Sequence, residues 1–410
     1  MRILLSAFVC EPDAGSERGN GWTWAQRLAR DHEVVVLTDS SFRSAIETRL
    51  AERPEPRLRV EYVGSGVRGL RGLRRVRYYG AWQRLALTRA RELERAAPFD
   101  VVHHVTFGAH RLPSYLWKLH APFVWGPVGG GEGVSPLFYL PRWMGWRESL
   151  REMARALSNL LVRVDPRVRR TAMNADVVAV TTQQTRRALP RSVRARAQVL
   201  PSTIVQRHTL DELATATPRP GSPAGLRLVY AGRLLGWKGG GLALRAFAAY
   251  AEHRPAAELH LYGDGRNRRW LERLTERLGL DARVRFHGRV PRSELIEAYS
   301  GFNAFLFPSL HDSSGFVTIE AQAAGLPVVC LDTGGPGAQV PAAAGVKVTP
   351  NRPAQTVRDL TRGLDHLTDD TAAWRAASAA ARAHALDPRA TPSIETMIAR
   401  LYGPVTGWSP

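Results

Sequence analysis

The sequence has few features that would mark a secreted, membrane-spanning or metal-binding protein. It holds two cysteines, Cys10 and Cys330, both in apolar stretches, which indicates reduced core thiols and excludes a disulfide scaffold. Each apolar run is interrupted by glycine, proline or a charge before it reaches the length of a bilayer. The run at residues 1–8 precedes an acidic, glycine-rich loop without a cleavage pattern, so we interpret it as a buried strand. No Cys/His spacing indicates a metal ion. We therefore expect a cytoplasmic globular protein.

Acidic residues are also scarce relative to basic ones, and the resulting net charge indicates which partners the protein attracts. The chain has 57 Lys and Arg against 37 Asp and Glu, a net charge of +20. Such an excess attracts a sugar nucleotide, an anionic membrane face or nucleic acid, although solvated arginines alone would produce the same number. Residues 66–95 hold nine arginines and two glutamates among aromatic and apolar residues, and residues 143–170 are similar. Both segments suit either a peripheral position on the inner face of an anionic membrane or a solvated basic face. No recognised nucleic-acid-binding module accompanies them.

At 410 residues the chain is too long for one ordinary core, and it reads as two α/β domains. Short apolar strands alternate with helical sequence, which is typical of parallel sheets covered on both faces. The expected strands are residues 1–8, 34–37, 60–63, 101–105, 226–230, 258–262, 284–287, 304–308 and 327–331. Helices are expected at 22–30 and 77–96. A polar stretch at 205–225 reads as an interdomain linker, so two doubly wound, Rossmann-like domains should face each other across a cleft.

The stretch from His311 to Glu320 is the first candidate for chemistry. A strand ends near residue 308, a Ser/Gly turn follows, and a helix begins near Gly315. Unpaired amides at such a helix start favour an anion, here a diphosphate. Asp312 and Glu320 lie on either side of the turn. A sugar nucleotide has hydroxyls on both sides of its phosphates, so one carboxylate could bind the sugar hydroxyls and the other the ribose diol. An N-cap Asp and an ordinary helical Glu would give the same pattern.

A second candidate is the loop from Gly232 to Gly239, which follows a strand and carries Arg233 and Lys238. Glycine lets the backbone approach a ligand closely, and two cations can neutralise a departing diphosphate. The Gly-Lys-Ser/Thr order of a Walker loop is absent. The alternative is a solvated basic turn.

In their order these motifs resemble the C-terminal domain of GT-B glycosyltransferases of family 4. The series runs from Gly232-Arg233 and Lys238-Gly239 through Gly263-Asp264-Gly265 and Phe286–Val290 to Asp312–Glu320. Its carboxylate pair is similar to the E-x7-E motif of that family, with Asp312 in place of the first Glu. The N-terminal half is similar too, at Gly15-Ser16-Glu17, at residues 103–108 and at residues 125–132, which look like a subgroup that assembles exopolysaccharides and related glycans.

The resemblance implies a domain division and a set of roles. It implies an acceptor-side domain at residues 1–204, onto which a helix at about 390–410 packs back, and a nucleotide-sugar-binding domain at 205–389. The catalytic residues implied are Arg233, Lys238 and Asp312. The donor-binding residues implied are Gly232, Gly263, Asp264, Gly265, Val290, Ser314, Gly315, Phe316 and Glu320, with Glu320 on the ribose. The acceptor-side residues are Gly15, Ser16, Glu17, His104, Gly129 and Glu132; a structural role for His104 and a solvent-exposed loop position for Glu132 are the alternatives.

The resemblance also implies the reaction: hexosyl transfer with retention from a UDP-sugar, or next a GDP-sugar, to a glycan, lipid-linked or small-molecule hydroxyl. No cofactor is expected, and since the chain lacks Asp-x-Asp, no metal is indicated on the diphosphate. Three departures stand out: Asp312 is shorter than Glu, Gly335-Pro336-Gly337 lacks an expected Glu, and Gly126-Pro127 replaces a common His. An epimerase or hydrolase of sugar nucleotides, or a basic nucleic-acid-binding protein, are the rival functions.

Overall fold

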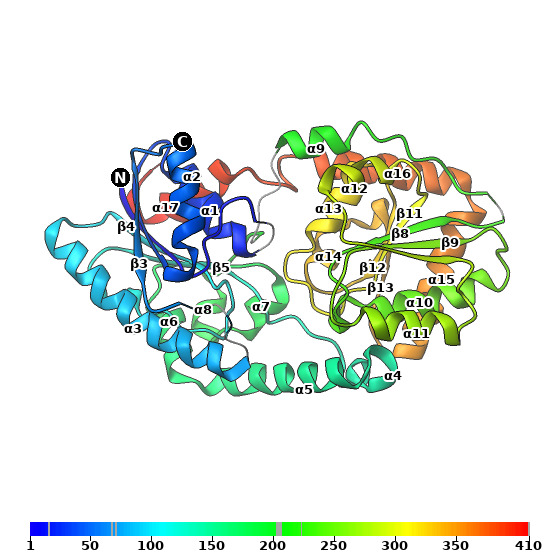
Figure 1. Ribbon diagram of the computed structural model, residues 1–410, viewed down its shortest axis with the longest axis horizontal. Helices are drawn as coiled ribbons and strands as arrows, with labels where there is room; N and C mark the ends of the chain where they lie inside the picture. The colour runs from blue at the N-terminus through cyan, green and yellow to red at the C-terminus, as the bar shows by residue number, and fades with distance from the viewer. Residues whose placement is uncertain (15–16, 67–68, 70–71, 202–206, 223, 409–410) are drawn as a thin grey trace. The chain divides into compact units, whose positions relative to one another are not determined.

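A computed structural model describes residues 1–14, 17–66, 69, 72–201, 207–222 and 224–408 (Figure 1). Its contacts divide the chain into two compact units. Unit 1 comprises Met1–Gly131, Asn159–Ile204 and Ile394–Pro410, and unit 2 comprises Glu132–Ser158 and Val205–Ser393. The structure thus differs from the expected division over residues 132–158, which belong to unit 2. The physical reason is that Phe138, Tyr139, Trp143 and Met144 of this segment are buried in the core of unit 2. Its buried carboxylates also bind loops of unit 2, as described below.

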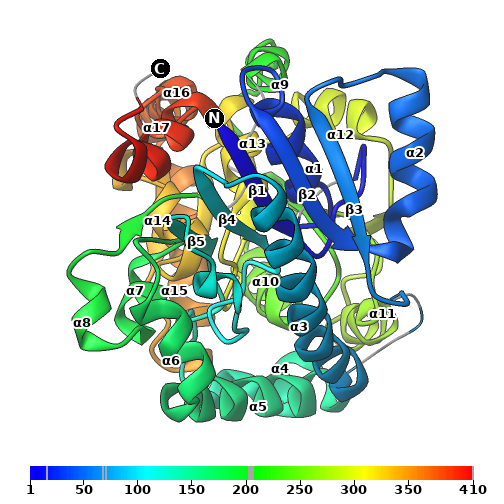
Figure 2. The ribbon, with the colours of Figure 1, turned by 90° about the vertical axis from the view of Figure 1, so that its left-hand side faces the viewer.

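Unit 1 is built on a seven-stranded, wholly parallel sheet in the order β3-β2-β1-β4-β5-β6-β7. The strands are β1 (Arg2–Ala7), β2 (Glu33–Asp39), β3 (Leu58–Val63), β4 (Val101–Thr106), β5 (Phe123–Val128), β6 (Val177–Val180) and β7 (Gln198–Val199). Figure 2 shows the first five of these side by side in that order. The central strands β1, β4 and β5 are buried almost throughout because both faces of the sheet are covered.

Helices cover both faces of this sheet. They are α1 (Glu17–Leu28), α2 (Arg43–Glu52), α3 (Gly72–Ala96), α6 (Pro166–Met173), α7 (Gln183–Ala188), α8 (Arg191–Arg194), α17 (Ile394–Thr406), η1 (Ser40–Phe42), η2 (Leu116–Lys118) and η4 (Val162–Val164). His103 and His104 on β4 point to opposite faces, as neighbours in a strand must. His103 contacts Trp24 of α1 and Tyr402 of α17, whereas His104 contacts Tyr79 of α3. The C-terminal helix α17 is therefore part of the core of unit 1.

Unit 2 has a six-stranded parallel sheet in the order β10-β9-β8-β11-β12-β13. The strands are β8 (Arg227–Ala231), β9 (Glu258–Tyr262), β10 (Val284–Gly288), β11 (Ala304–Phe307), β12 (Val328–Leu331) and β13 (Gly345–Val348). Its helices are α4 (Pro141–Met144), α9 (Arg207–Leu213), α10 (Gly240–Ala251), α11 (Arg268–Arg277), α12 (Arg292–Tyr299), α13 (Phe316–Ala323), α14 (Gly334–Gln339), α15 (Pro353–Asp369), α16 (Thr371–Leu386), η3 (Pro136–Tyr139), η5 (Gly236–Lys238) and η6 (Ala342–Ala344). Helix α5 (Trp146–Leu161) belongs to unit 2 up to Ser158.

Two further expectations need correction. The expected linker contains helix α9, whose Leu210 and Leu213 are buried in the core of unit 2. Helix α1 begins at Glu17 rather than at residue 22, so Glu17 is helical and supplies a negative charge to the first turn.

The strand order places a potential ligand site in each unit. In both sheets the order reverses beside the first strand, between β1 and β4 in unit 1 and between β8 and β11 in unit 2. Ligands of open parallel sheets bind at the carboxyl ends of the strands at such a switch point. In unit 2 these ends lead into the loops at Gly232 and at Ser309, which are the two motifs singled out in the sequence.

Candidate active site

The loops that follow β8, β9 and β11 approach each other closely at the edge of the unit 2 sheet that the carboxyl ends of its strands form. The Gly232 amide donates to the carbonyl oxygen of Tyr262 at 2.9 Å. Gly263 has φ +127°, and a Cβ there would overlap the carbonyl oxygen of Gly232. Likewise a Cβ at Gly239, with φ +78°, would overlap the carbonyl oxygen of Pro308. These glycines are therefore required by backbone contact, and they bring the candidate loops together.

An ion pair between Lys238 and Asp312 joins the two candidate motifs. The Lys238 Nζ donates to Oδ2 of Asp312, and its ammonium also lies 4.5 Å from the ring centroid of Trp237. The Oδ1 of Asp312 accepts hydrogen bonds from the amides of Ser314 and Gly315, each at 3.2 Å. Burial alone would raise the pKa of Asp312, but the Lys238 charge and these amides outweigh it and hold the pKa below its ordinary value. Asp312 is thus an ionised, buried carboxylate that organises the turn before α13.

The start of α13 is fixed by a glycine in the left-handed region. Gly315 is the N-cap with φ +60°, and a Cβ there would lie 2.7 Å from the nitrogen of Pro336. The neighbouring Gly335 amide donates to the carbonyl oxygen of Asp312 at 2.6 Å. The N-terminal amides of α13 begin at Phe316, directly after this turn, and a helix start of this kind attracts an anion.

Arg233 provides a cation at the same edge. It follows Gly232, its side chain is exposed, and within the described residues no ion pair or side-chain hydrogen bond engages its guanidinium. Lys238, by contrast, is already neutralised by Asp312. Arg233 is therefore the group of this edge whose charge is open to a ligand.

Glu320, the second carboxylate of the motif, lies in α13 and pairs with Arg292 at 2.5 Å between Oε1 and Nη2. Burial raises the pKa of Glu320, and the Arg292 charge opposes this rise without cancelling it. The carboxylate is thus one that would gain from a hydroxyl donor nearby. Its assignment to a ribose stays a prediction.

The remaining donor-side residues surround these loops. The Gly263 amide donates to the carbonyl oxygen of Gly288 at 2.6 Å, two residues before the partly buried Val290. The Asp264 carboxylate accepts a hydrogen bond from the Gly265 amide at 2.7 Å. The backbone carbonyl oxygen of Asp264 accepts one from the Leu234 amide at 3.0 Å. All of these residues lie in unit 2, so the structure brings the predicted donor-side set onto one unit.

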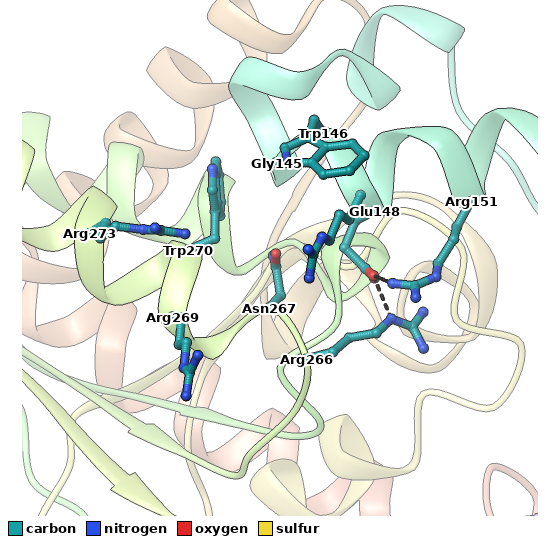
Figure 3. A pocket seen from close by; sticks show the side chains of 10 residues that line it. Gly145, Trp146, Glu148, Arg151, Arg266, Asn267, Arg269, Trp270 and Arg273 are labelled. Carbon is teal, nitrogen blue, oxygen red and sulfur yellow. Dashed lines mark hydrogen bonds and ion pairs between the residues drawn. The ribbon is translucent and has the colours of Figure 1, made fainter.

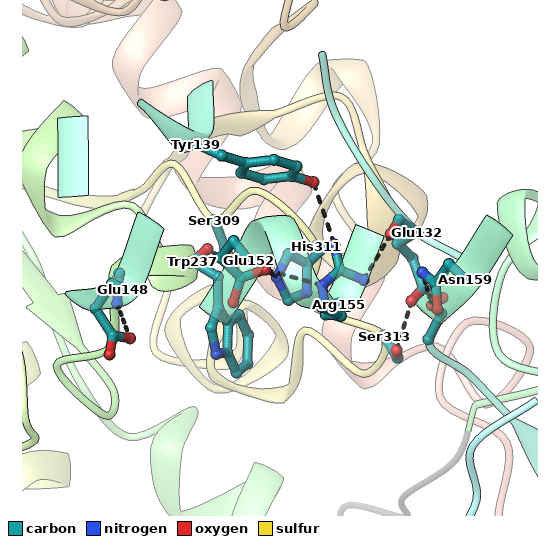
Figure 4. A network of polar contacts seen from close by, with 12 residues as sticks. Glu132, Tyr139, Glu148, Glu152, Arg155, Asn159, Trp237, Ser309, His311 and Ser313 are labelled. Carbon is teal, nitrogen blue, oxygen red and sulfur yellow. Dashed lines mark hydrogen bonds and ion pairs between the residues drawn. The ribbon is translucent and has the colours of Figure 1, made fainter. Parts of the chain in front are cut away.

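A buried polar network that the sequence did not point to supports the same loops (Figure 4). His311 Nε2 and Glu152 Oε2 are 2.6 Å apart, and the Arg155 Nε donates to the same carboxylate at 2.8 Å. Burial lowers the pKa of His311, so its neutral imidazole acts as an N–H donor. Burial opposes ionisation of Glu152, but the donors from His311 and Arg155 lower its pKa. The indole of Trp237 stacks on His311 with centroids 4.7 Å apart, which connects the network to Lys238.

Two more carboxylates of the same segment hold these loops. Glu148 accepts the Gly236 amide at 3.0 Å and also pairs with Arg151 and Arg266. Glu132, predicted on the acceptor side, lies in unit 2, where it accepts the Ser313 hydroxyl at 2.7 Å. The only signal of Glu148 and Glu152 in the sequence is their four-residue spacing on a helix, which alone does not separate a buried pair from a solvated one.

The residues of unit 1 that were predicted on the acceptor side differ in their surroundings. Gly15 and Ser16 lie outside the described residues. Glu17 accepts the Gly108 amide at 2.9 Å, and the Gly129 amide donates to the Gly108 carbonyl at 2.8 Å, so these two predicted residues meet at Gly108. His104 is fully buried, with Nδ1 3.2 Å from the Ser6 hydroxyl and Nε2 3.2 Å from the Phe107 carbonyl. These partners support a structural role for His104, which is the alternative to contact with the acceptor.

No group of three or more His, Cys, Asp or Glu side chains among the described residues is arranged to hold a metal ion. None of the described helices combines the length and the apolar character that a bilayer crossing requires.

Comparison with known proteins identifies the chemistry of unit 2. Residues 223–380 match the model of the family described as glycosyl transferases group 1. The chain carries a group 1 glycosyl transferase domain and is a glycosyltransferase. Over 388 residues it is 26% identical to 2-deoxystreptamine glucosyltransferase of Streptomyces kanamyceticus, which covers 88% of this chain and 91% of that one. It is 31% identical over 176 residues to D-inositol 3-phosphate glycosyltransferase of Corynebacterium glutamicum (strain R), over 40% of this chain and 42% of the relative.

Solved glycosyltransferase structures share the fold. Sucrose-phosphate synthase from Thermosynechococcus elongatus superposes over 100% of both chains with a TM-score of 0.66 at 19% identity. Anabaena HepE in complex with UDP and glucose covers 93% of this chain and 94% of its own, with a TM-score of 0.58 at 17% identity. The expected GT-B fold, with two Rossmann-like domains, is thereby confirmed.

Proposed function

We propose that this glycosyltransferase moves a sugar with retention from a nucleoside-diphosphate sugar to a hydroxyl of a glycan, lipid-linked or small-molecule acceptor. A UDP-sugar is the first choice of donor and a GDP-sugar the second. The observation that carries the proposal is the joining of the two loop motifs by the Lys238–Asp312 pair, with the open guanidinium of Arg233 at the same sheet edge. The proposed roles follow from the charges found there.

The main demand of glycosyl transfer is the negative charge that develops on the leaving diphosphate. Fixed donors aimed at that charge stabilise it without reorganisation during the reaction. In the proposal, Arg233 supplies the net positive charge, Lys238 supplies N–H donors, and the first amides of α13 supply the helix dipole. Asp312 keeps Lys238 in place and offers its remaining lone pairs to sugar hydroxyls. Glu320 would then accept from the ribose.

Known relatives support the donor choice and leave the acceptor broad. The HepE complex contains UDP and glucose, and the relative from Streptomyces kanamyceticus is named for a glucosyl transfer to 2-deoxystreptamine. The second relative is named for D-inositol 3-phosphate. These acceptors are polyhydroxylated and small, so a small polyol belongs in the first acceptor screen beside lipid-linked glycans. Glu17 and Gly129 stay proposed acceptor-side residues.

The donor site is tested by thermal unfolding with UDP, GDP, ADP and dTDP. A ligand that binds only the folded state at a concentration 100 times its Kd stabilises it by about 2.7 kcal/mol, so a binder raises the Tm. We expect the largest rise with UDP and its loss in Arg233→Ala. The matched control is Arg375→Ala, which removes an exposed arginine of α16 in the same unit. Equal UDP shifts in both variants would exclude Arg233 from the diphosphate site.

The reaction is tested by product analysis with the donor sugar found in that screen. Retention predicts a product with the anomeric configuration of the donor, read from its proton coupling constants. Incubation without acceptor should leave the donor almost unchanged, because a transferase requires the accepting hydroxyl. Rapid consumption of the donor alone, or an epimerised donor, would favour the hydrolase or epimerase instead.

A further inference from the structure

Helix α5 has its polar face turned inward and its apolar face turned outward. Glu148, Ser149 and Glu152 are the buried residues of the helix, each at most 3% exposed. Two of them are the carboxylates that hold the Gly236 and His311 loops. An ordinary surface helix is oriented the other way, with its apolar stripe on the core.

The outward face of α5 is a continuous stripe of large apolar side chains. Trp146, Leu150, Met153 and Leu157 recur at four- and three-residue steps, and each is 56–60% exposed. Leu160 and Leu161 continue the stripe to the end of the helix. All exposed large hydrophobic residues of unit 2, counted over the described part of the chain, come from the segment that contains this helix. They are Leu137, Leu140, Trp146, Leu150, Met153 and Leu157.

A basic pocket adjoins the N-terminal end of the stripe (Figure 3). Its volume is about 430 Å³, and Trp146 and Trp270 contribute to its lining. The arginines that line it are Arg147, Arg151, Arg266, Arg269 and Arg273. Glu148 is the one acidic residue of the lining, and it pairs with Arg151 and Arg266. The other three arginines have no acidic partner among the described residues, so the pocket presents unneutralised guanidinium groups beside an apolar stripe.

We propose that α5 and this pocket dock the protein on a membrane surface of anionic phospholipid. The apolar stripe would enter the boundary between headgroups and acyl chains, and the arginines would bind headgroup phosphates. This is a specific form of the membrane contact that the sequence suggested for two segments, and it assigns that contact to α5. It is independent of the proposed donor and reaction.

Charge complementarity favours this occupant over a second copy of the chain. The acidic residues of α5 are buried, so its exposed charges are the positive Arg147 and Arg151. A second copy placed on the same face would bring arginines against arginines without an acidic complement. A phospholipid surface supplies both an apolar phase for the stripe and phosphates for the pocket.

The test uses flotation of the full-length protein with vesicles of phosphatidylcholine alone or mixed with phosphatidylglycerol. We expect binding to the mixed vesicles only, weakened about tenfold or more by the pair Leu150→Gln and Leu157→Gln. The matched control is Val76→Gln with Leu85→Gln on α3, the other candidate segment. These side chains are nearly as exposed, at 53% and 51% against 58% and 57% for Leu150 and Leu157. This pair should bind like the parent protein.

A second pair, Arg269→Ala with Arg273→Ala, tests the pocket. It should reduce binding to the mixed vesicles by a similar factor, and the parent should lose binding as salt is raised. All variants change exposed side chains, so an unchanged Tm and an unchanged nucleotide-induced Tm shift verify their fold and keep this test separate from that of the donor site.

The proposal is overturned if the parent protein does not bind the mixed vesicles, or if the α3 pair weakens binding as much as the α5 pair. It is also overturned if light scattering shows a dimer that the α5 pair converts to a monomer while vesicles fail to bind. That outcome would make the stripe an interface between copies.

Discussion

At the residue scale, the buried pair of Glu152 and His311 is a part of the candidate site that the sequence motifs did not indicate. Glu152→Gln keeps the acceptor oxygen for His311 and Arg155 but removes the charge, so we expect a loss of about 1–3 kcal/mol in the free energy of unfolding. Glu152→Ala leaves two buried donors without an acceptor and should cost about 3–5 kcal/mol. Chemical denaturation measures both values.

The same variants show whether Glu152 positions the loop at His311 and Asp312, which is proposed to bind the donor. His311 directly precedes Asp312, so a loosened His311 should raise the KM for the donor more than it lowers kcat, with Gln between the parent and Ala. An unchanged KM in a destabilised Glu152→Ala protein would show that the pair is structural only.

At this scale, the residues that the sequence identifies are those in which local pattern and backbone chemistry coincide. Asp312 and Gly315 share one turn, and Lys238 belongs to a glycine-rich loop after a strand, so their types and spacing already indicated a loop site. The Lys238–Asp312 ion pair itself connects positions 74 residues apart, which spacing cannot specify. Glu152 is 159 residues from His311, and neither belongs to a motif with the other. Only the fold reveals such a pair.

At the scale of single elements, the start of α13 depends on the absence of a side chain at Gly315. Gly315→Ala requires an L-residue at φ +60°, which costs about 1–2 kcal/mol, and adds a contact at 2.7 Å from the Pro336 nitrogen. Overpacking of this kind typically costs about 1–3 kcal/mol more. We therefore expect a loss of about 2–5 kcal/mol, together with weaker donor binding.

Gly279→Ala is the matched control for this strain. Gly279 has φ +66°, but a Cβ there would meet no atom within 4 Å, so the control isolates the backbone term. Denaturation curves should show about 1–2 kcal/mol for Gly279→Ala and a larger loss for Gly315→Ala. Equal losses would mean that α13 and the Pro336 loop can separate without cost.

Most strands and helices could be predicted from the spacing of apolar residues and from composition. The exceptions have physical causes. The strands of both sheets are short apolar runs, so β1, β8 and β11 were predictable. Helix α9 resembles a linker in sequence because it is mostly polar, and Leu210 and Leu213 are its only buried apolar residues. The assignment of residues 132–158 to unit 2 rests on apolar residues such as Phe138 and Met144, which lie in its core, and on the buried contacts of three glutamates. Carboxylates ordinarily indicate a solvated surface.

For the molecule as a whole, the charge of +20 predicted an anionic partner but not its place. In unit 2 five arginines line the pocket beside α5, and Arg233 lies at the proposed donor site. The two locations would serve two different anions, a phospholipid surface and a diphosphate. Composition alone could not separate them, because both draw on the same excess of arginine.

Global stability should fall as the pH drops below neutral, because unit 1 buries neutral histidines. Burial lowers the pKa of His103 to about 3 and that of His104 to about 4, against 6.5 as the ordinary value. As the pH falls from 6.5 to about 4, the unfolded chain therefore progressively binds a proton on each of these two histidines, whereas the folded chain does not. Stability is lost as pH falls through this window, at about 1.4 kcal/mol per pH unit for each histidine.

Denaturation at pH 7, 6 and 5 measures this slope. His104→Asn keeps polar partners for Ser6 and the Phe107 carbonyl but removes one titrating group. Its slope should therefore be shallower than that of the parent, by a difference that approaches about 1.4 kcal/mol per pH unit between pH 6 and 5. If His104→Asn retained the slope of the parent, the imidazole of His104 would have to accept a proton in the folded state. His104 would then be accessible to a ligand or to solvent, as the acceptor-side interpretation of this residue requires.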